Sequence, residues 1–97
     1  MTDISSIRKA IHPIAEKYGV DRVYLFGSRA RGSERPDSDY DFLISKGRVT
    51  NLWLMASLWE DMEKALNARV DVVTDTSSDR SFIDTVRKDA KLIYERP

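Results

Sequence analysis

Two carboxylates near the middle of the chain, those of Asp39 and Asp41, combine a residue type and a spacing that suit chemistry. Asp39 directly precedes, and Asp41 enters, an apolar segment predicted to be a strand over Tyr40–Ser45. Residues i and i+2 of a strand point to the same face, so the two carboxylates lie side by side. They repel each other unless a cation lies between them. Mg²⁺ suits this position because it takes oxygen ligands and shares them with substrate phosphates.

A glycine and a serine, Gly27 and Ser28, predict a phosphate site ahead of these acids. Ten residues separate Ser28 from Asp39. Gly27 ends a short apolar run in a tight turn, where a residue without a Cβ is favoured. Ser28 opens a short helix predicted over residues 29–32, and a helix N-terminus presents unpaired N–H groups and partial positive charge. The Ser28 hydroxyl adds a donor, and Arg29 and Arg31 add positive potential. A phosphate site followed by a Mg²⁺ site is the outline of a nucleoside triphosphate site.

A third carboxylate, Asp71, interrupts the apolar strand predicted over Val70–Thr74. A carboxylate is costly to bury unpaired in such a strand, and a cation beside Asp39 and Asp41 would pair it. This interpretation completes a set of three carboxylates from two strands. The alternative is an edge-strand aspartate paired with an arginine.

Apolar periodicity predicts the helices and strands that position these residues. The first helix, Ile4–Tyr18, is capped by Thr2 or Asp3 and continues in phase across Pro13, so one bent helix is expected. A strand over Arg22–Phe26 follows it. The polar loop 33–38 then leads to the acids, and Ser38 is expected to shape the metal loop.

A long helix predicted over residues 51–67 carries an apolar arc of roughly 200°. Its inward stripe includes Leu52, whereas Trp53 falls outside the arc. Such an arc is wider than a simple surface helix needs, so this helix packs deeply on the sheet or also meets a partner. A cap-rich turn, 76–79, then precedes a helix over 79–88 with Phe82 inward, and the apolar residues 92–94 form a brief strand or extended segment.

Length and composition exclude several classes of protein and of binding site. The 97 residues predict one domain, 1–97, and the absence of cysteine removes any thiolate metal site. Sixteen basic and sixteen acidic residues give a net charge of zero, so strong nucleic-acid binding through bulk charge is not expected. No apolar run approaches the roughly 20 residues of a membrane span. The first ten residues also lack the apolar centre of a signal peptide, so a cytoplasmic protein is expected.

These motifs resemble the nucleotidyltransferase superfamily of DNA polymerase β, and most closely its minimal members, over nearly the whole chain. The matching residues, in chain order, are Gly27, Ser28, Ala30, Arg31, Gly32, Ser38, Asp39 and Asp41. The resemblance implies an α/β (α+β) fold with a small mixed three-stranded sheet, to which a short fourth strand is an optional addition, and about four helices.

The resemblance also implies roles for individual residues. Gly27 and Ser28 grip the triphosphate of ATP, with Arg31 and Ser38 as further candidates for nucleotide binding. Asp39 and Asp41 hold Mg²⁺, two ions being expected. Asp71 helps to hold the ion nearest the attacking hydroxyl, which makes these three acids the candidate catalytic residues.

Minimal members of the superfamily usually occur beside a HEPN-type ribonuclease toxin. The resemblance therefore implies a hetero-oligomer in which this chain transfers AMP from ATP to the hydroxyl of a tyrosine of the toxin. This modification is expected to neutralise the toxin. One alternative is a non-catalytic antitoxin that masks its partner, to which the wide apolar arc and Trp53 would contribute. Another is nucleotidyl transfer to RNA or to a small molecule, which the neutral charge and the absence of a second domain disfavour.

Overall fold

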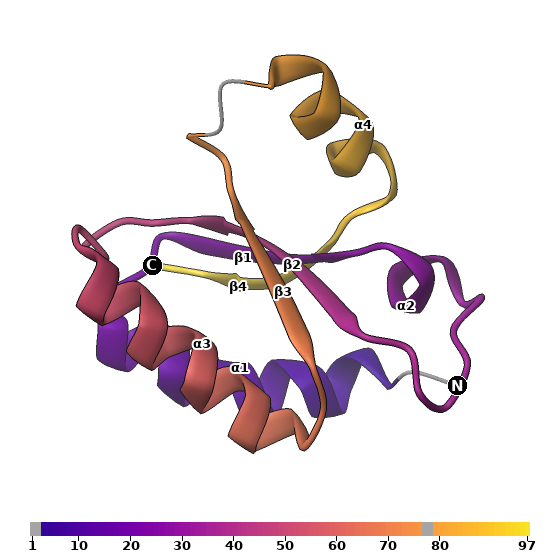
Figure 1. Cartoon of the computed structure of the whole chain (residues 1–97), viewed down its shortest axis with the longest axis horizontal. Helices are drawn as coiled ribbons and strands as arrows, with labels where there is room; N and C mark the ends of the chain where they lie inside the picture. Colours follow the sequence, from indigo (N-terminus) through magenta and orange to yellow (C-terminus); the bar gives the residue numbers. More distant parts are fainter. Residues whose placement is uncertain (1–2, 77–78) are drawn as a thin grey trace.

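The computed structural model describes residues 3–76 and 79–97, which form a four-stranded sheet with helices on both faces (Figure 1). The strand order is β3-β2-β1-β4; β1 is antiparallel to β2 and to β4, and β2 is parallel to β3. This mixed sheet confirms the predicted fold class and includes the fourth strand. The elements are α1 (Ile4–Tyr18), β1 (Arg22–Phe26), α2 (Ser28–Arg31), β2 (Tyr40–Ser45), α3 (Leu52–Leu66), β3 (Val70–Thr74), α4 (Arg80–Asp89) and β4 (Lys91–Glu95).

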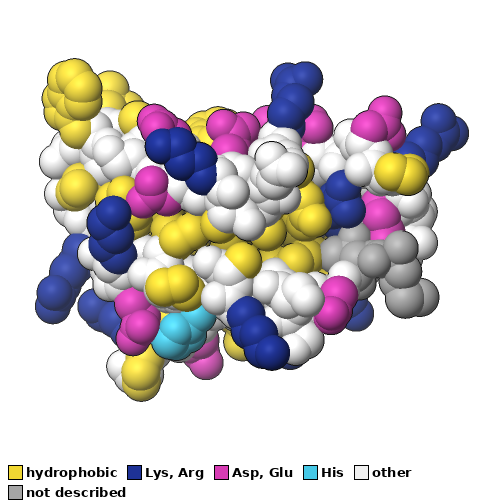
Figure 2. All heavy atoms as spheres, turned by 90° about the horizontal axis from the view of Figure 1, so that it is seen from below, with side chains coloured by type: hydrophobic (Ala, Val, Ile, Leu, Met, Phe, Trp, Pro, Cys, Tyr) yellow, Lys and Arg dark blue, Asp and Glu magenta, His cyan; other side chains and the backbone are white. Residues whose placement is uncertain are grey.

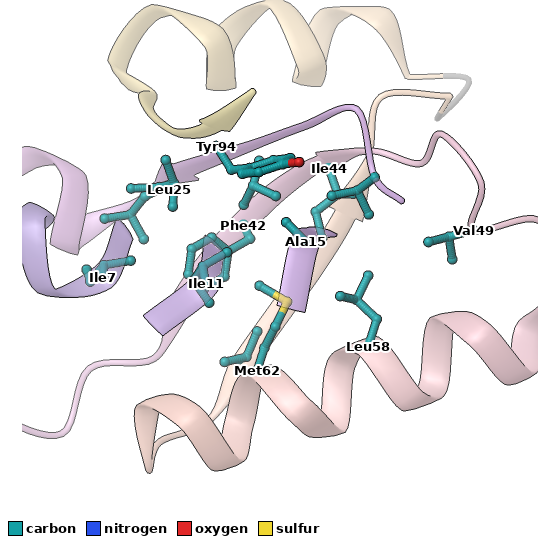
Figure 3. Close-up of a cluster of buried hydrophobic side chains, with 14 residues drawn as sticks. Ile7, Ile11, Ala15, Leu25, Phe42, Ile44, Val49, Leu58, Met62 and Tyr94 are labelled. Carbon is teal, nitrogen blue, oxygen red and sulfur yellow. The ribbon is translucent and has the colours of Figure 1, made fainter. Parts of the chain in front are cut away.

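Helices α1 and α3 lie side by side against one face of the sheet, and the main core fills the space between these layers (Figure 3). The side chains of this core are fully or almost fully buried and come from both helices and from all four strands. Its members are Ile7, Ile11, Ala15, Val20, Val23, Leu25, Phe42, Ile44, Val49, Leu58, Met62, Val70, Ile93 and Tyr94. Burial of this continuous apolar surface is the dominant stabilising contribution to the fold.

Helix α1 is a single helix across Pro13, as predicted. The carboxylate of Asp3 caps its start by accepting from the backbone N–H of Ser5 at 3.0 Å, and Gly19 ends it in a left-handed conformation with φ 71°. The alternative cap, Thr2, lies outside the described residues. No helix within residues 3–76 and 79–97 is long and apolar enough to cross a membrane.

Helix α3 corrects one prediction about its inward stripe. Leu58 and Met62 are buried against the sheet, but Leu52 is 86% exposed. At 100° per residue Leu52 lies about 120° around the helix from Leu58, beyond the width that the sheet and α1 can cover. Trp53, predicted outside the arc, is 85% exposed. The apolar arc is therefore wider than the surface that α3 buries within the chain.

Within the described residues, α4 is the helix that covers the other face of the sheet (Figure 1). Ile83 and Val86 of this helix pack on Leu43 in a second, smaller cluster. Phe82, predicted to point inward, is 41% exposed, and its ring meets that of Phe26 edge-on with centroids 6.3 Å apart. The predicted turn 76–79 includes residues 77 and 78, which lie outside the described residues.

Candidate active site

The turn between β1 and α2 closes tightly against β2. Gly27 has φ 76°, and its carbonyl accepts from the backbone N–H groups of Ala30 and Arg31, each at 3.1 Å. A Cβ at Gly27 would overlap the carboxylate of Asp41, because Phe26 and Asp41 are register partners in the β1–β2 pair. The absence of a side chain at position 27 therefore lets the turn approach the acid closely.

The parallel pairing of β2 and β3 places Asp41 directly opposite Asp71. Both side chains lie on the face of the sheet that α4 covers, since Leu43 and Val73, two residues further along each strand, pack in the α4 cluster. Asp39 immediately precedes β2. The structure thus brings Asp41 and Asp71 to one end of this face, beside the Gly27 turn, with Asp39 next to them in the chain.

The pKa of Asp41 is raised above its ordinary value of 3.8. Burial of the carboxyl is the largest cause, followed by the charges of Asp71 and Asp39 and a hydrogen bond with Asp71, whereas the charge of Arg31 acts in the opposite direction. Asp41 and Asp71 are register partners on one face of the sheet, and the charge of Asp39 also acts on Asp41. Among residues 3–76 and 79–97, no three acidic, His or Cys side chains are gathered closely enough to enclose a metal ion.

The chemistry of this acid set fits a hard divalent cation. The charges of Asp39 and Asp71 both oppose ionisation of Asp41, and the missing Cβ of Gly27 keeps its carboxylate open on the side of the turn. A cation would remove the repulsion, and carboxylate oxygens are the ligands that Mg²⁺ prefers. The alternative for Asp71 was an edge-strand aspartate paired with an arginine. β3 is an edge strand, but in the described part of the chain Asp71 forms no ion pair with an arginine.

The four candidate nucleotide-binding residues lie in the segment between β1 and β2, which leads to Asp39 and Asp41. Gly27 and Ser28 form the turn and the first residue of α2, which begins one residue earlier than predicted. Ser28 is half-buried, and Arg31 is exposed at the end of α2, from where its charge acts on Asp41. Ser38 closes the preceding turn: its Oγ accepts from the N–H of Arg35 at 2.8 Å.

Arg29 has a specific position that sequence reasoning missed. Its guanidinium donates to the carbonyl of Ser38, from Nε at 3.0 Å and from Nη2 at 2.6 Å. The same group lies 4.0 Å from the ring centroid of Tyr40. The only sequence signal was an arginine beside the phosphate turn, which indicated positive potential but not a contact nine residues away.

Comparison with known proteins agrees with this geometry. The family described as polymerase beta, nucleotidyltransferase matches residues 9–97. The chain therefore belongs to this nucleotidyltransferase family, and its helix and strand order is that of the minimal nucleotidyltransferase fold.

The relatives include proteins that are named as protein adenylyltransferases. A candidate protein adenylyltransferase of Methanocaldococcus jannaschii, MJ0435, is 34% identical over 88 residues, which cover 91% of this chain and 95% of the relative. The protein adenylyltransferase MntA of Thermococcus cleftensis is 33% identical over 76 residues, which cover 78% of this chain and 77% of the relative.

Three solved structures share the fold. A candidate minimal nucleotidyltransferase has a TM-score of 0.79 at 31% identity, covering 93% of this chain and 95% of that one. A toxin–antitoxin structure with AMP-PNP has a TM-score of 0.77 at 21% identity, covering 92% and 73%. A tri-AMPylated Shewanella oneidensis HEPN toxin in complex with MNT antitoxin gives a TM-score of 0.67 at 19% identity, covering 97% and 74%.

Proposed function

We propose that this chain transfers AMP from ATP to a hydroxyl of a HEPN-type toxin, a tyrosine, and thereby neutralises the toxin. The observation that carries the proposal is the closure of the Gly27 turn directly against Asp41, which lies opposite Asp71 in the β2–β3 pair. Nucleotidyl transfer requires a phosphate-binding site next to carboxylates that can bind Mg²⁺. The names of the relatives as protein adenylyltransferases support a protein acceptor.

In the proposed site, Gly27 and Ser28 bind the triphosphate through backbone N–H groups and the Ser28 hydroxyl, with Arg31 and Ser38 supporting the nucleotide. The tight turn at Gly27 brings these donors next to the acids. Asp39, Asp41 and Asp71 would hold Mg²⁺, two ions being expected. When bound, Mg²⁺ supplies positive charge that orients the triphosphate and neutralises the departing pyrophosphate.

The proposed transfer is an in-line displacement. The acceptor oxygen forms a bond to the α-phosphorus of ATP, the bond from that phosphorus to the bridging oxygen breaks, and pyrophosphate leaves. The acceptor proton passes to the carboxylate of Asp71, which lies on the edge strand β3 and is exposed. Positioning of the two reactants and stabilisation of charge account for most of the expected acceleration.

The proposed partner and setting follow from the same fold. We treat residues 1–97 as a single nucleotidyltransferase domain whose acceptor is a separate protein docked beside α4 and β3, in a hetero-oligomer. Toxin–antitoxin complexes among the structural neighbours, one of them with an AMPylated HEPN toxin, support this partner class. We place the reaction in the cytoplasm, where ATP is available.

The test is a transfer assay with labelled ATP, Mg²⁺ and a candidate HEPN-type toxin. Wild type is expected to leave adenylate on the toxin, and Asp39→Ala/Asp41→Ala is expected to leave none. Glu16→Ala/Asp37→Ala is the matched control, since it removes two exposed acids and should transfer at the wild-type rate. Absence of adenylate on the toxin with wild type would refute the proposed activity.

A second candidate, an antitoxin that only masks its partner, is favoured by the exposure of Leu52 and Trp53 on α3. Exposed aromatic side chains often anchor protein interfaces. The two candidates differ in cells that express the toxin: catalysis requires that Asp39→Ala/Asp41→Ala fail to protect at equal expression. Full protection by that variant, lost on Trp53→Ala, would favour masking.

A further inference from the structure

We propose that Arg29 is a positioning residue, whose guanidinium fixes the backbone on both sides of Asp39 and so sets this acid relative to the Gly27–Ser28 turn. The inference rests on the function proposed above and extends it to a residue outside the acid set and the phosphate turn. Arg29 follows Ser28 directly in α2, so one short helix carries both the turn and the side chain that reaches the acid loop.

The first contact is with the peptide that leads into Asp39. The carbonyl of Ser38 belongs to this peptide and accepts two hydrogen bonds from Arg29, at 3.0 Å from Nε and 2.6 Å from Nη2. Both donors come from one rigid, planar group, so they fix the direction of the carbonyl as well as its distance. The remaining groups of Ser38 are held by Arg35, through its backbone N–H and carbonyl.

The second contact is with the residue that follows Asp39. The Arg29 guanidinium lies over the ring of Tyr40, with Cζ 4.0 Å from its centroid. The Tyr40 ring is in turn stacked near the ring of Phe42, with an interplanar angle of 4° and centroids 6.3 Å apart. Because Phe42 is fully buried in the main core, this stack connects the Arg29 guanidinium to closely packed side chains.

These two contacts lie on opposite sides of Asp39 in the sequence. The backbone of Asp39 is thereby held between a clamped carbonyl and a stacked ring, while its carboxylate belongs to the crowded acid set. An acid that is oriented before the nucleotide arrives loses little conformational freedom on binding. Lysine cannot replace arginine here, because an ammonium lacks the two parallel donors and the flat face.

The chain offers a matched control for the hydrogen-bonding part of this arrangement. Arg8 of α1 also donates from Nε and Nη2 to one backbone carbonyl, that of Leu92 in β4, at 3.2 and 3.0 Å. This second clamp joins α1 to β4 and not α2 to the acid loop. Arg8→Lys therefore removes the same kind of contact without touching the proposed site.

The test compares Arg29→Lys, Arg8→Lys and wild type in AMP transfer and in calorimetric binding of a non-hydrolysable ATP analogue across a Mg²⁺ titration. For Arg29→Lys we expect kcat to fall about 100-fold and the Mg²⁺ concentration for half-maximal analogue binding to rise about 10-fold. Analogue affinity without Mg²⁺ should stay within about 2-fold of wild type, because the phosphate turn is intact. Arg8→Lys should leave all three quantities unchanged.

Two results would overturn the inference: a wild-type Mg²⁺ requirement in Arg29→Lys, or the same change in Arg8→Lys. If Arg29→Lys does not fold, Tyr40→Leu and Tyr40→Phe replace it; only Tyr40→Leu should raise the Mg²⁺ requirement, and equal behaviour of the pair would contradict the proposal. The calorimetric measurement needs no toxin. A wild-type protein that binds Mg²⁺ and the analogue but modifies no toxin would therefore refute the proposed function without touching the role of Arg29.

Discussion

The two faces of the sheet differ in how completely they are covered. Helices α1 and α3 cover one face and enclose the main core, in which Phe42, Leu58 and Met62 are fully or almost fully buried. In the described part of the chain the other face is covered by α4, which buries a small cluster around Ile83 and leaves the acids at one end. The free energy of folding thus comes mainly from one face, and the other is available for chemistry.

Carboxylates on the two sides show the same contrast. On the α1–α3 side, the hydroxyl of Tyr18 donates to Asp61 at 2.7 Å and Lys17 donates at 3.3 Å, and the Tyr18 hydrogen bond is the main reason that the pKa of Asp61 is lowered. On the α4 side, burial and neighbouring acids raise the pKa of Asp41. One carboxylate stabilises the fold when ionised, and the ionised form of the other opposes folding.

On the outer surface of the α1–α3 layer, charges of both signs lie around a hydrophobic band (Figure 2).

The largest effect is expected at the glycine that separates the turn from the acids. Gly27→Ala would place a Cβ on the Asp41 carboxylate, and we expect AMP transfer to fall by about 10²- to 10³-fold. Gly32→Ala is the control, since Gly32 has the same φ of 76° but no described atom lies within 4 Å of its Cβ position. A rate for Gly27→Ala like that of Gly32→Ala in the labelled-ATP assay would contradict the close approach of turn and acid.

The next effect separates the two leucines of α3. Leu58→Ala should lower the free energy of unfolding by about 3 kcal/mol, because it leaves a cavity in the main core. Leu52→Ala should change it by less than about 0.5 kcal/mol, because this side chain is 86% exposed. Urea unfolding measures both. Equal losses would show that the apolar arc is buried against another surface.

A smaller effect is expected for the hydrogen bond that joins Tyr18 of α1 to Asp61 of α3. Tyr18→Phe removes the donor to Asp61 and should lower the free energy of unfolding by about 0.5–1 kcal/mol at pH 7. The lowered pKa of Asp61 gives a contribution that is present above its ordinary value of 3.8 and lost as the pH falls through the lowered value. The difference between Tyr18→Phe and wild type should therefore shrink on acidification, which urea unfolding at several pH values measures. A difference that stays constant with pH would show that Tyr18 does not stabilise the ionised Asp61.

The smallest effect has the opposite sign. The raised pKa of Asp41 means that its contribution to stability is present below 3.8 and is lost as the pH rises through the raised value. Asp41→Asn should therefore unfold at a higher urea concentration than wild type at pH 7, in the presence of a chelator, with the gain disappearing at low pH. Asp37→Asn, which changes an exposed loop acid, controls for net charge. A loss of stability in Asp41→Asn would show that the acid set does not oppose folding.

Local patterns predicted much of this architecture because they depend on neighbouring residues. The bounds of α1 and of the first three strands agree with the apolar periodicity, and the alternation along β2 and β3 places Asp41 and Asp71 on one face. Leu52 was wrongly expected to point inward, and Phe82, expected inward, packs on Phe26 but stays 41% exposed, since periodicity gives the direction of a side chain but not the extent of the layer opposite it. The contact of Arg29 with Ser38 and Tyr40 depends on how a polar loop folds back, which no periodic pattern describes.

The register between β2 and β3 makes the spacing of the acids depend on a very short connection. Only residues 67–69 join α3 to β3, and they begin with Asn67 in a left-handed conformation, φ 49°. One residue more or fewer there would shift β3 by one position and turn Asp71 toward the apolar layer under the sheet. Chains that keep this acid set are therefore expected to preserve the number of residues between α3 and β3.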